Sequence, residues 1–246
     1  MRRFTWRIYL GAALVAMSAL LYVAQIAIFH AERDTFFYLF QDLAFIPIQV
    51  LLVTLVLSRL LTVREKLSML NKLNMVIGVF FSEVGTPLVK SLAAFDGNAE
   101  KIRAELQVNG EWSDQRFASV IRRARDFDYQ VYHTTSDLKT LRTFLMAKRN
   151  FLLGLLENPN LLEHEAFTEL LWAVFHLTEE LAVREELQQL TEADGNHIAR
   201  DIRRAYTILI IEWLSYMKHL KNDYPYLFSF AVRTNPFNPD ASPVVK

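Results

Sequence analysis

Two apolar stretches near the N-terminus decide the fold: IYLGAALVAMSALLYVAQIAIF (Ile8–Phe29) and LAFIPIQVLLVTLVLSRLL (Leu43–Leu61). About 20 apolar residues in a helix that rises about 1.5 Å per residue cross a hydrocarbon core about 30 Å thick. The first stretch exceeds the about 7–15 apolar residues of a signal peptide, so we expect it to be retained. The sequence therefore predicts an integral membrane protein in which residues 1–62 form a transmembrane hairpin, with spans at about 8–29 and 43–61.

Positive charges at the ends of the hairpin predict its orientation. Three of them (Arg2, Arg3 and Arg7) precede the first span, and four (Arg59, Arg64, Lys66 and Lys72) lie at the end of the second span or follow it. The connection between the spans holds only Arg33, beside two acids. Lys and Arg concentrate on the cytoplasmic side of membrane proteins. We therefore expect a multi-pass protein of the cell inner (cytoplasmic) membrane, with both termini cytoplasmic.

After residue 62 apolar residues recur at helical spacing almost without interruption. This pattern predicts an all-α protein, with a juxtamembrane helix over 63–94, a cytoplasmic helical bundle over 95–230 and a flexible tail over 231–246. Tyr224, Tyr226, Phe228 and Phe230 instead alternate at a period of two. Because a lone strand has no partner in a helical domain, we interpret this run as an extended segment packed on the bundle.

Capping residues and apolar stripes predict the individual helices. Ser113 is expected to cap a helix that runs to about Tyr132, and Thr191 or Asn196 to start a long helix that ends near Asn222. The predicted core stripe of the long helix is Ile202, Tyr206, Leu209, Ile210, Trp213, Met217 and Leu220.

The segment FFSEVGTPLVKSL (Phe80–Leu92) contains the string Ser82-Glu83-Val84-Gly85-Thr86-Pro87-Leu88. This string resembles the H-box of sensor histidine kinases, H-E-x-x-T-P-L, with Ser82 in place of the phosphoacceptor histidine. No ATP-binding box of that family follows, so we exclude a kinase. The residues themselves predict a helix break, with Gly85 ending one helix and Thr86 and Pro87 starting the next.

Composition and motifs argue against most catalytic chemistry. The chain has no Cys, and it contains no P-loop, G-x-S-x-G, G-x-G-x-x-G or H-E-x-x-H string. A metal site built from His176-x-x-Glu179 and Asp194-x-x-His197 is the weaker alternative to solvated helix faces. The net charge is zero and residues 95–246 hold more acids than bases, which argues against nucleic acid as a partner. We predict no enzyme, no cofactor and no catalytic or metal-binding residue.

Two sets of residues are candidates for a site. Leu67, Leu70, Asn74, Ile77, Phe81 and Val84 follow heptad spacing, which predicts a parallel homodimer seam with Asn74 at a core position. A second apolar stripe beside them favours the alternative, burial of this helix inside its own bundle. Asp42 and Gln49 are candidate polar residues in the membrane. Asp42 either takes part in ion or proton transfer or lies at a helix end that water solvates.

These features leave the biochemical role open. The favoured hypothesis is a non-enzymatic, membrane-anchored scaffold or regulatory protein-interaction module, whose partners are the lipid bilayer and a partner protein or a second copy. One alternative is a signalling subunit that relays movement of the hairpin to the cytoplasmic bundle. Another is an accessory protein of a channel or transporter.

Overall fold

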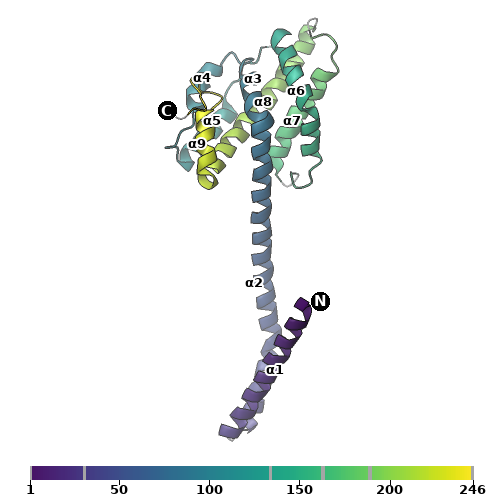
Figure 1. Cartoon of the computed structure of the whole chain (residues 1–246), viewed down its shortest axis with the longest axis vertical. Coiled ribbons are helices and arrows are strands. Elements are labelled where there is room, and N and C mark those ends of the chain that lie inside the picture. Colours follow the sequence, from purple (N-terminus) through teal and green to yellow (C-terminus); the bar gives the residue numbers. More distant parts are fainter. Residues whose placement is uncertain (1, 30–31, 133–134, 162–163, 188–189, 245–246) are drawn as a thin grey trace. The chain divides into compact units, whose positions relative to one another are not determined.

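A computed structural model of the chain describes residues 2–29, 32–132, 135–161, 164–187 and 190–244 (Figure 1). Throughout these residues the regular structure is helical, apart from an isolated bridge between Asp96 and Val131. The predicted all-α class is therefore confirmed. The chain divides into two compact units, Met1–Lys66 and Leu67–Lys246.

The first unit contains helix α1 (Arg2–Phe29) and the beginning of helix α2 (Glu32–Phe80). Within α2, the stretch Arg33–Arg64 has a mean hydropathy of 2.1, and the chain buries none of its most apolar 18-residue window. A second stretch, Leu73–Ala93, is also long and apolar enough to cross a membrane, but 44% of its window is buried inside the fold. By length and composition, two helical stretches could thus span a bilayer.

The second unit is a helical bundle built on the long helix α8 (Glu192–Asp223). Helix α7 (Glu165–Ala182) packs on α8, and α6 (Thr135–Leu156) packs on α7 (Figure 1). Other parts of α8 contact α3 (Thr86–Ala93), α5 (Asp114–Asp126) and α9 (Pro225–Arg233). A short α4 (Ala99–Arg103) continues into a 3₁₀ turn, Ala104–Leu106.

Local sequence signals account for the helices around the core. The Ser113 hydroxyl accepts a hydrogen bond from the Arg116 amide, and the Thr191 hydroxyl accepts one from the Asp194 amide, so both predicted caps are confirmed. Helix α5 ends at Asp126, before its predicted end near Tyr132. All seven predicted core residues of α8 are buried. Helix α8 therefore forms the centre of the bundle because its apolar stripe is continuous.

The last turns of α2 belong to the same core. Leu73, Ile77 and Phe80 are buried there, and the ring of Phe80 packs edge-on against Phe167 of α7 at 5.2 Å between centroids. The region predicted as a juxtamembrane helix therefore supplies core residues to the bundle. This burial agrees with the alternative to a dimer seam, in which the helix packs inside the chain's own bundle.

The predicted boundary lies at the right residues, since α3 begins at Thr86 with Pro87 in its first turn, but the predicted break of the helical path there is wrong. Instead, the chain passes from α2 through a π-helical segment, Phe81–Gly85, into α3, and the Thr86 amide donates to the Phe81 carbonyl five residues earlier. Gly85 has helical dihedrals, φ −60° and ψ −52°. Pro87 lacks an N–H, and in an α-helix its ring would clash with the carbonyl four residues before it. The wider π turn accommodates the proline without ending the helix.

The C-terminal region also differs from its prediction. Residues 225–233 form helix α9, not an extended segment, and Pro225 starts it because its fixed φ suits the first turn. Beyond α9, the Asn235 side-chain amide donates to the Leu106 carbonyl at 3.1 Å, and Phe237 packs on Trp213. Residues 231–237 of the predicted flexible tail are thus part of the fold, through contacts with distant elements.

Candidate functional site

An apolar groove lies in the second unit between the end of α2, the π segment, α8 and α9. Its cavity volume is about 590 Å³, within the range of about 300–1,000 Å³ that is typical of ligand-binding sites. Its apolar lining includes Met75, Val79, Phe81, Trp213, Tyr216, Tyr226 and Phe230. Asn74, Ser82, Thr86 and His219 are among its polar lining residues. The groove thus combines a broad apolar surface with a few polar groups.

The π segment and α8 form one wall of the groove. The Phe81 ring stacks on Tyr216 with 4.8 Å between centroids and an interplanar angle of 12°. Gly78 of α2 faces the same tyrosine, since a Cβ at this residue would be in ordinary van der Waals contact with the Tyr216 hydroxyl at 3.5 Å. Burial raises the pKa of Tyr216. Its hydroxyl therefore stays protonated and remains a hydrogen-bond donor in this wall.

Polar contacts connect α2 to α8 at the groove. The Asn74 side-chain amide lies 3.4 Å from His219 Nδ1, and that same nitrogen lies 2.8 Å from Asp223 Oδ2. His219 Nε2 is buried and has no hydrogen-bond partner among the residues that the structure describes. Asn74 is therefore a half-buried polar residue inside the chain's own bundle.

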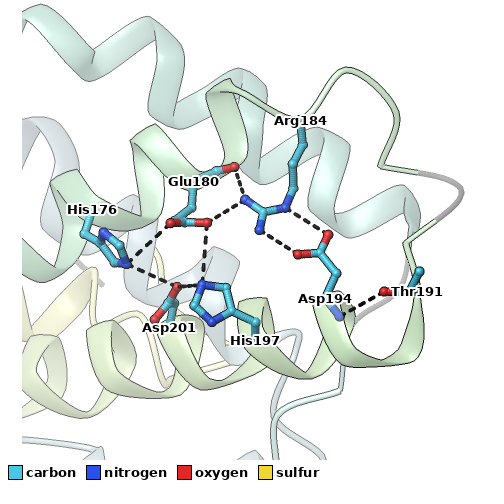
Figure 2. A network of polar contacts seen from close by, with 7 residues as sticks. All are labelled: His176, Glu180, Arg184, Thr191, Asp194, His197 and Asp201. Atoms are coloured by element: carbon cyan, nitrogen blue, oxygen red, sulfur yellow. Dashed lines mark hydrogen bonds and ion pairs between the residues drawn. The ribbon is translucent and has the colours of Figure 1, made fainter.

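A second polar site lies between α7 and α8, centred on Arg184 (Figure 2). The guanidinium donates to the Glu180 carboxylate at 2.6 Å and to both oxygens of the Asp194 carboxylate at 2.7 and 3.0 Å. Arg184 also donates to the Glu180 carbonyl. These charge-assisted bonds hold the pKa values of both carboxyls below their ordinary range. Arg184 thereby bridges the end of α7 to the first turn of α8.

Two histidines complete this polar site (Figure 2). Asp201 Oδ2 lies 3.4 Å from the Nε2 atoms of both His176 and His197. The Glu180 carboxylate lies 3.8 Å from His176 Nε2 and 3.5 Å from His197 Nε2. Asp201 Oδ2 is buried and accepts no hydrogen bond within the described part of the chain. Two imidazoles and two carboxylates therefore converge on one small volume.

The metal site that the sequence offered as the weaker alternative to solvated helix faces placed each histidine with an acid three residues away. Glu179 pairs with Arg149 at 2.7 Å and Asp194 pairs with Arg184, so neither joins the histidines as a pair three residues apart. The residues that converge are four apart, His176 with Glu180 on α7 and His197 with Asp201 on α8. Residues four apart share a helix face. Two such pairs on successive helices were a signal that was available in the sequence.

The predicted self-association residues lie mostly within the fold. Ile77, Phe81 and Val84 are buried in the core of the second unit. The side chains of Leu67 and Leu70 lie outside the described residues. Burial of the other members leaves little of the proposed seam available to a second copy. Asp42 and Gln49 lie on α2 in the first unit, where the chain does not cover them.

Comparisons with known proteins match both units to one protein family. The family described as "MJ1433, N-terminal helical domain" matches residues 2–61, and "Uncharacterized protein MJ1433, C-terminal helical domain" matches residues 69–233. A relative with the name "Uncharacterized protein MJ1433", from Methanocaldococcus jannaschii, is 42% identical over 233 residues, which cover 95% of this chain and 94% of the relative. No solved structure matches the chain.

Proposed function

This chain belongs to the MJ1433 family of proteins with an N-terminal and a C-terminal helical domain, and from that premise we propose that it is a non-enzymatic, membrane-anchored interaction protein. Residues 1–62 anchor it in the cytoplasmic membrane with both termini on the cytoplasmic side. The second unit binds a partner protein through the apolar groove.

The main support for a membrane anchor is the apolar surface of α2 that the chain leaves exposed. No residue in the most apolar 18-residue window of Arg33–Arg64 is buried by the chain. Exposing apolar surface to water costs about 25 cal/mol per Å², and soluble monomers rarely present a contiguous apolar patch larger than a few hundred Å². A hydrocarbon environment removes this cost. The positive charges on either side of the hairpin support the orientation.

The observation that supports a protein partner is the exposure of large apolar residues along the groove. Val79 is 50% exposed, Tyr226 70% and Phe230 51%. Aromatic side chains in concave sites are the usual anchors of protein interfaces. An apolar helix face fits a groove lined by helices, because its side chains at three- and four-residue spacing fill such a depression. We propose a helix of a partner protein as the occupant.

An extraction experiment tests the anchor. Membranes that contain the full chain are washed with alkaline carbonate, which releases peripheral proteins, and then with a mild detergent. We expect the chain to stay with the membrane in carbonate and to dissolve in detergent, whereas a chain that starts at Leu67 should be released by carbonate. Release of the full chain by carbonate would reject the anchor.

Photo-crosslinking tests the groove. A photoreactive amino acid replaces Val79 in the groove or, as a control, Met146, which is 42% exposed on α6. We expect one protein adduct from Val79 that is absent from Met146, and Phe230→Asp should suppress that adduct by placing a charge in the groove. Equal adducts from both positions, no protein adduct from Val79, or an adduct only to lipid would contradict the proposed partner.

The continuity of α2 favours a second candidate, the signalling subunit. This helix contributes residues to both units, so it is a route by which movement of the hairpin reaches the groove. Insertion of Gly-Gly after Lys66 separates the two candidates. A scaffold should keep the Val79 adduct unchanged, whereas a relay should change its yield.

A further inference from the structure

The convergence of His176, His197 and Asp201 has the geometry of metal ligands. The two ring nitrogens and one carboxylate oxygen of these residues all lie within 4.8 Å of one another. In a tetrahedral site the distance between two ligand atoms is about 1.6 times the bond length, or about 3.3–3.4 Å for bonds of about 2.0–2.1 Å. Both distances from Asp201 Oδ2 to the histidine nitrogens are 3.4 Å. Two edges of such a tetrahedron are therefore already in place.

The positions of these residues are set by two packed helices. His176 extends from α7, and His197 and Asp201 extend from successive turns of α8 (Figure 2). The Thr191 cap fixes the start of α8, and Arg184 holds Glu180 and Asp194 beside the histidines. Sites on rigid helices with hydrogen-bonded supporting residues need little reorganisation when an ion binds.

The charges of the site favour a divalent cation. The carboxylates of Glu180 and Asp194 share the guanidinium of Arg184, and the Asp201 carboxylate lies beside the two histidines. With neutral imidazoles, the negative charge of Asp201 has no cationic partner within this group of residues. Among the described residues, the ion-pair contacts of Asp201 are with the two histidines alone. Its buried Oδ2 atom, which accepts no hydrogen bond from the described residues, lies where a cation would be held.

We propose that His176, His197 and Asp201 bind Zn²⁺ between α7 and α8, with Glu180 as the positioning residue beside the ion. Two imidazoles and a carboxylate match the ligand preference of Zn²⁺, and sites with three protein ligands keep one coordination position open. The ion joins α7 to α8 and stabilises their packing. This site is separate from the groove and does not depend on the function proposed for it.

The competing explanation is an ion-pair network in which protonated histidines neutralise the carboxylates. Such a network has no affinity for metal beyond that of an ordinary acidic surface. A metal site, in contrast, binds one ion per chain and loses it when any one ligand is removed. Metal binding by ligand variants therefore separates the two explanations.

The experiment uses the full chain in mild detergent after removal of metal by a chelator. Equilibrium dialysis against Zn²⁺, read by elemental analysis, should give about one ion per chain, and Co²⁺ should give the strong visible bands of tetrahedral coordination. We expect His176→Asn and Asp201→Asn to weaken Zn²⁺ binding more than about tenfold. Glu180→Gln should also weaken it, because the change removes a negative charge that lies 3.8 and 3.5 Å from the two Nε2 atoms that bind the ion.

Asp223→Asn is the matched control, the same change on the same helix at an acid that contacts His219. It should leave Zn²⁺ binding unchanged. Circular dichroism of each metal-free variant verifies that it folds. His176→Asn is the decisive variant, because the His176 side chain is 50% exposed and its replacement should leave the core intact. Absence of stoichiometric Zn²⁺ in the wild type, or equal binding by wild type and His176→Asn, would overturn the proposal.

Discussion

Glu212 is a carboxyl that the bundle buries on α8, with 7% of the residue exposed. Burial disfavours its charged form, and the nearby charge of Glu169 adds to this effect, so that the pKa of Glu212 is raised to about 7. Its ordinary pKa is 4.5. The folded chain therefore keeps this proton over a pH range in which the unfolded chain has already lost it.

This difference in pKa between the folded and the unfolded chain makes the stability decrease as the pH rises. Between about pH 4.5 and 7 the folded state binds the extra proton, so the free energy of unfolding decreases as the pH rises. A shift from 4.5 to about 7 corresponds to about 3 kcal/mol. We expect Glu212→Gln to raise the free energy of unfolding by up to about 3 kcal/mol at pH 8 and by much less at pH 4.

Urea unfolding of the full chain in mild detergent at the two pH values, followed by circular dichroism, measures this effect. The exposed Glu111 offers a matched control, since Glu111→Gln should change stability little at either pH. An equal effect of Glu212→Gln at both pH values would argue against a buried carboxyl that titrates near 7.

The π-helical segment makes Gly85 a tightly constrained position between two elements. A Cβ at this residue would lie 2.4 Å from Phe81 Cδ1 and 3.0 Å from Phe80 Cε1. Both rings are buried, at 1% and 0% exposed, and cannot move aside without disturbing the core. The requirement at Gly85 is therefore for space and not for an unusual backbone dihedral, because its φ is −60°.

Paired glycine variants test this interpretation of the segment. We expect Gly85→Ala to lower the free energy of unfolding by about 1–3 kcal/mol, the usual cost of overpacking a core. A Cβ at Gly154 of α6 would have no atom within 4 Å outside the helix backbone. Gly154→Ala should therefore stabilise the chain by up to about 1 kcal/mol through helix propensity. Calorimetry or urea unfolding compares the two, and a neutral Gly85→Ala would contradict the packing described.

The boundary of the second unit determines which fragment of the molecule folds alone. Between residues 73 and 94, whose side chains the structure describes, eight apolar side chains are buried in its core: Leu73, Ile77, Phe80, Phe81, Val84, Leu88, Val89 and Leu92. Burial of one such side chain is worth about 1.5–3 kcal/mol, so their combined loss of about 12–24 kcal/mol is as large as or larger than the total stability of about 5–15 kcal/mol that is typical of a domain.

We therefore expect a fragment of residues 67–246 to be soluble, helical and cooperative in thermal unfolding. A fragment of residues 95–246 should aggregate or lack a cooperative transition, because it exposes the surface that α2 and α3 cover. Size-exclusion chromatography and calorimetry of the two fragments provide the measurement. A well-folded 95–246 fragment would show that the core does not need the end of α2.

The orientation that we propose for the chain in a membrane can be tested by single-cysteine labelling, because the chain has no native Cys. Asp34 and Gln107 are both exposed in the fold. We expect Asp34→Cys to react with an impermeant maleimide in intact cells, and Gln107→Cys to react only after the cells are opened. The reverse pattern would reject the orientation deduced from the positive charges.

Local interactions explain what the sequence by itself determined. Helix content, the caps at Ser113 and Thr191 and the core stripe of α8 depend on residues three or four apart on one helix. Such spacings are visible in the chain without knowledge of its neighbours. The long apolar stretches are visible for the same reason, since they depend on length and composition alone.

Tertiary contacts decided the rest. Pro87 indicated a break, but burial of Phe81 and Val84 kept the chain helical through a π turn. The Tyr224–Phe230 alternation indicated an extended chain, yet packing against α8 made it helix α9. His176 and Asp201 are 25 positions apart in the sequence, and only the packing of α7 on α8 brings them within 3.4 Å. Periodicity within one helix carries no information about which faces of two helices meet, because that depends on how the complete core packs.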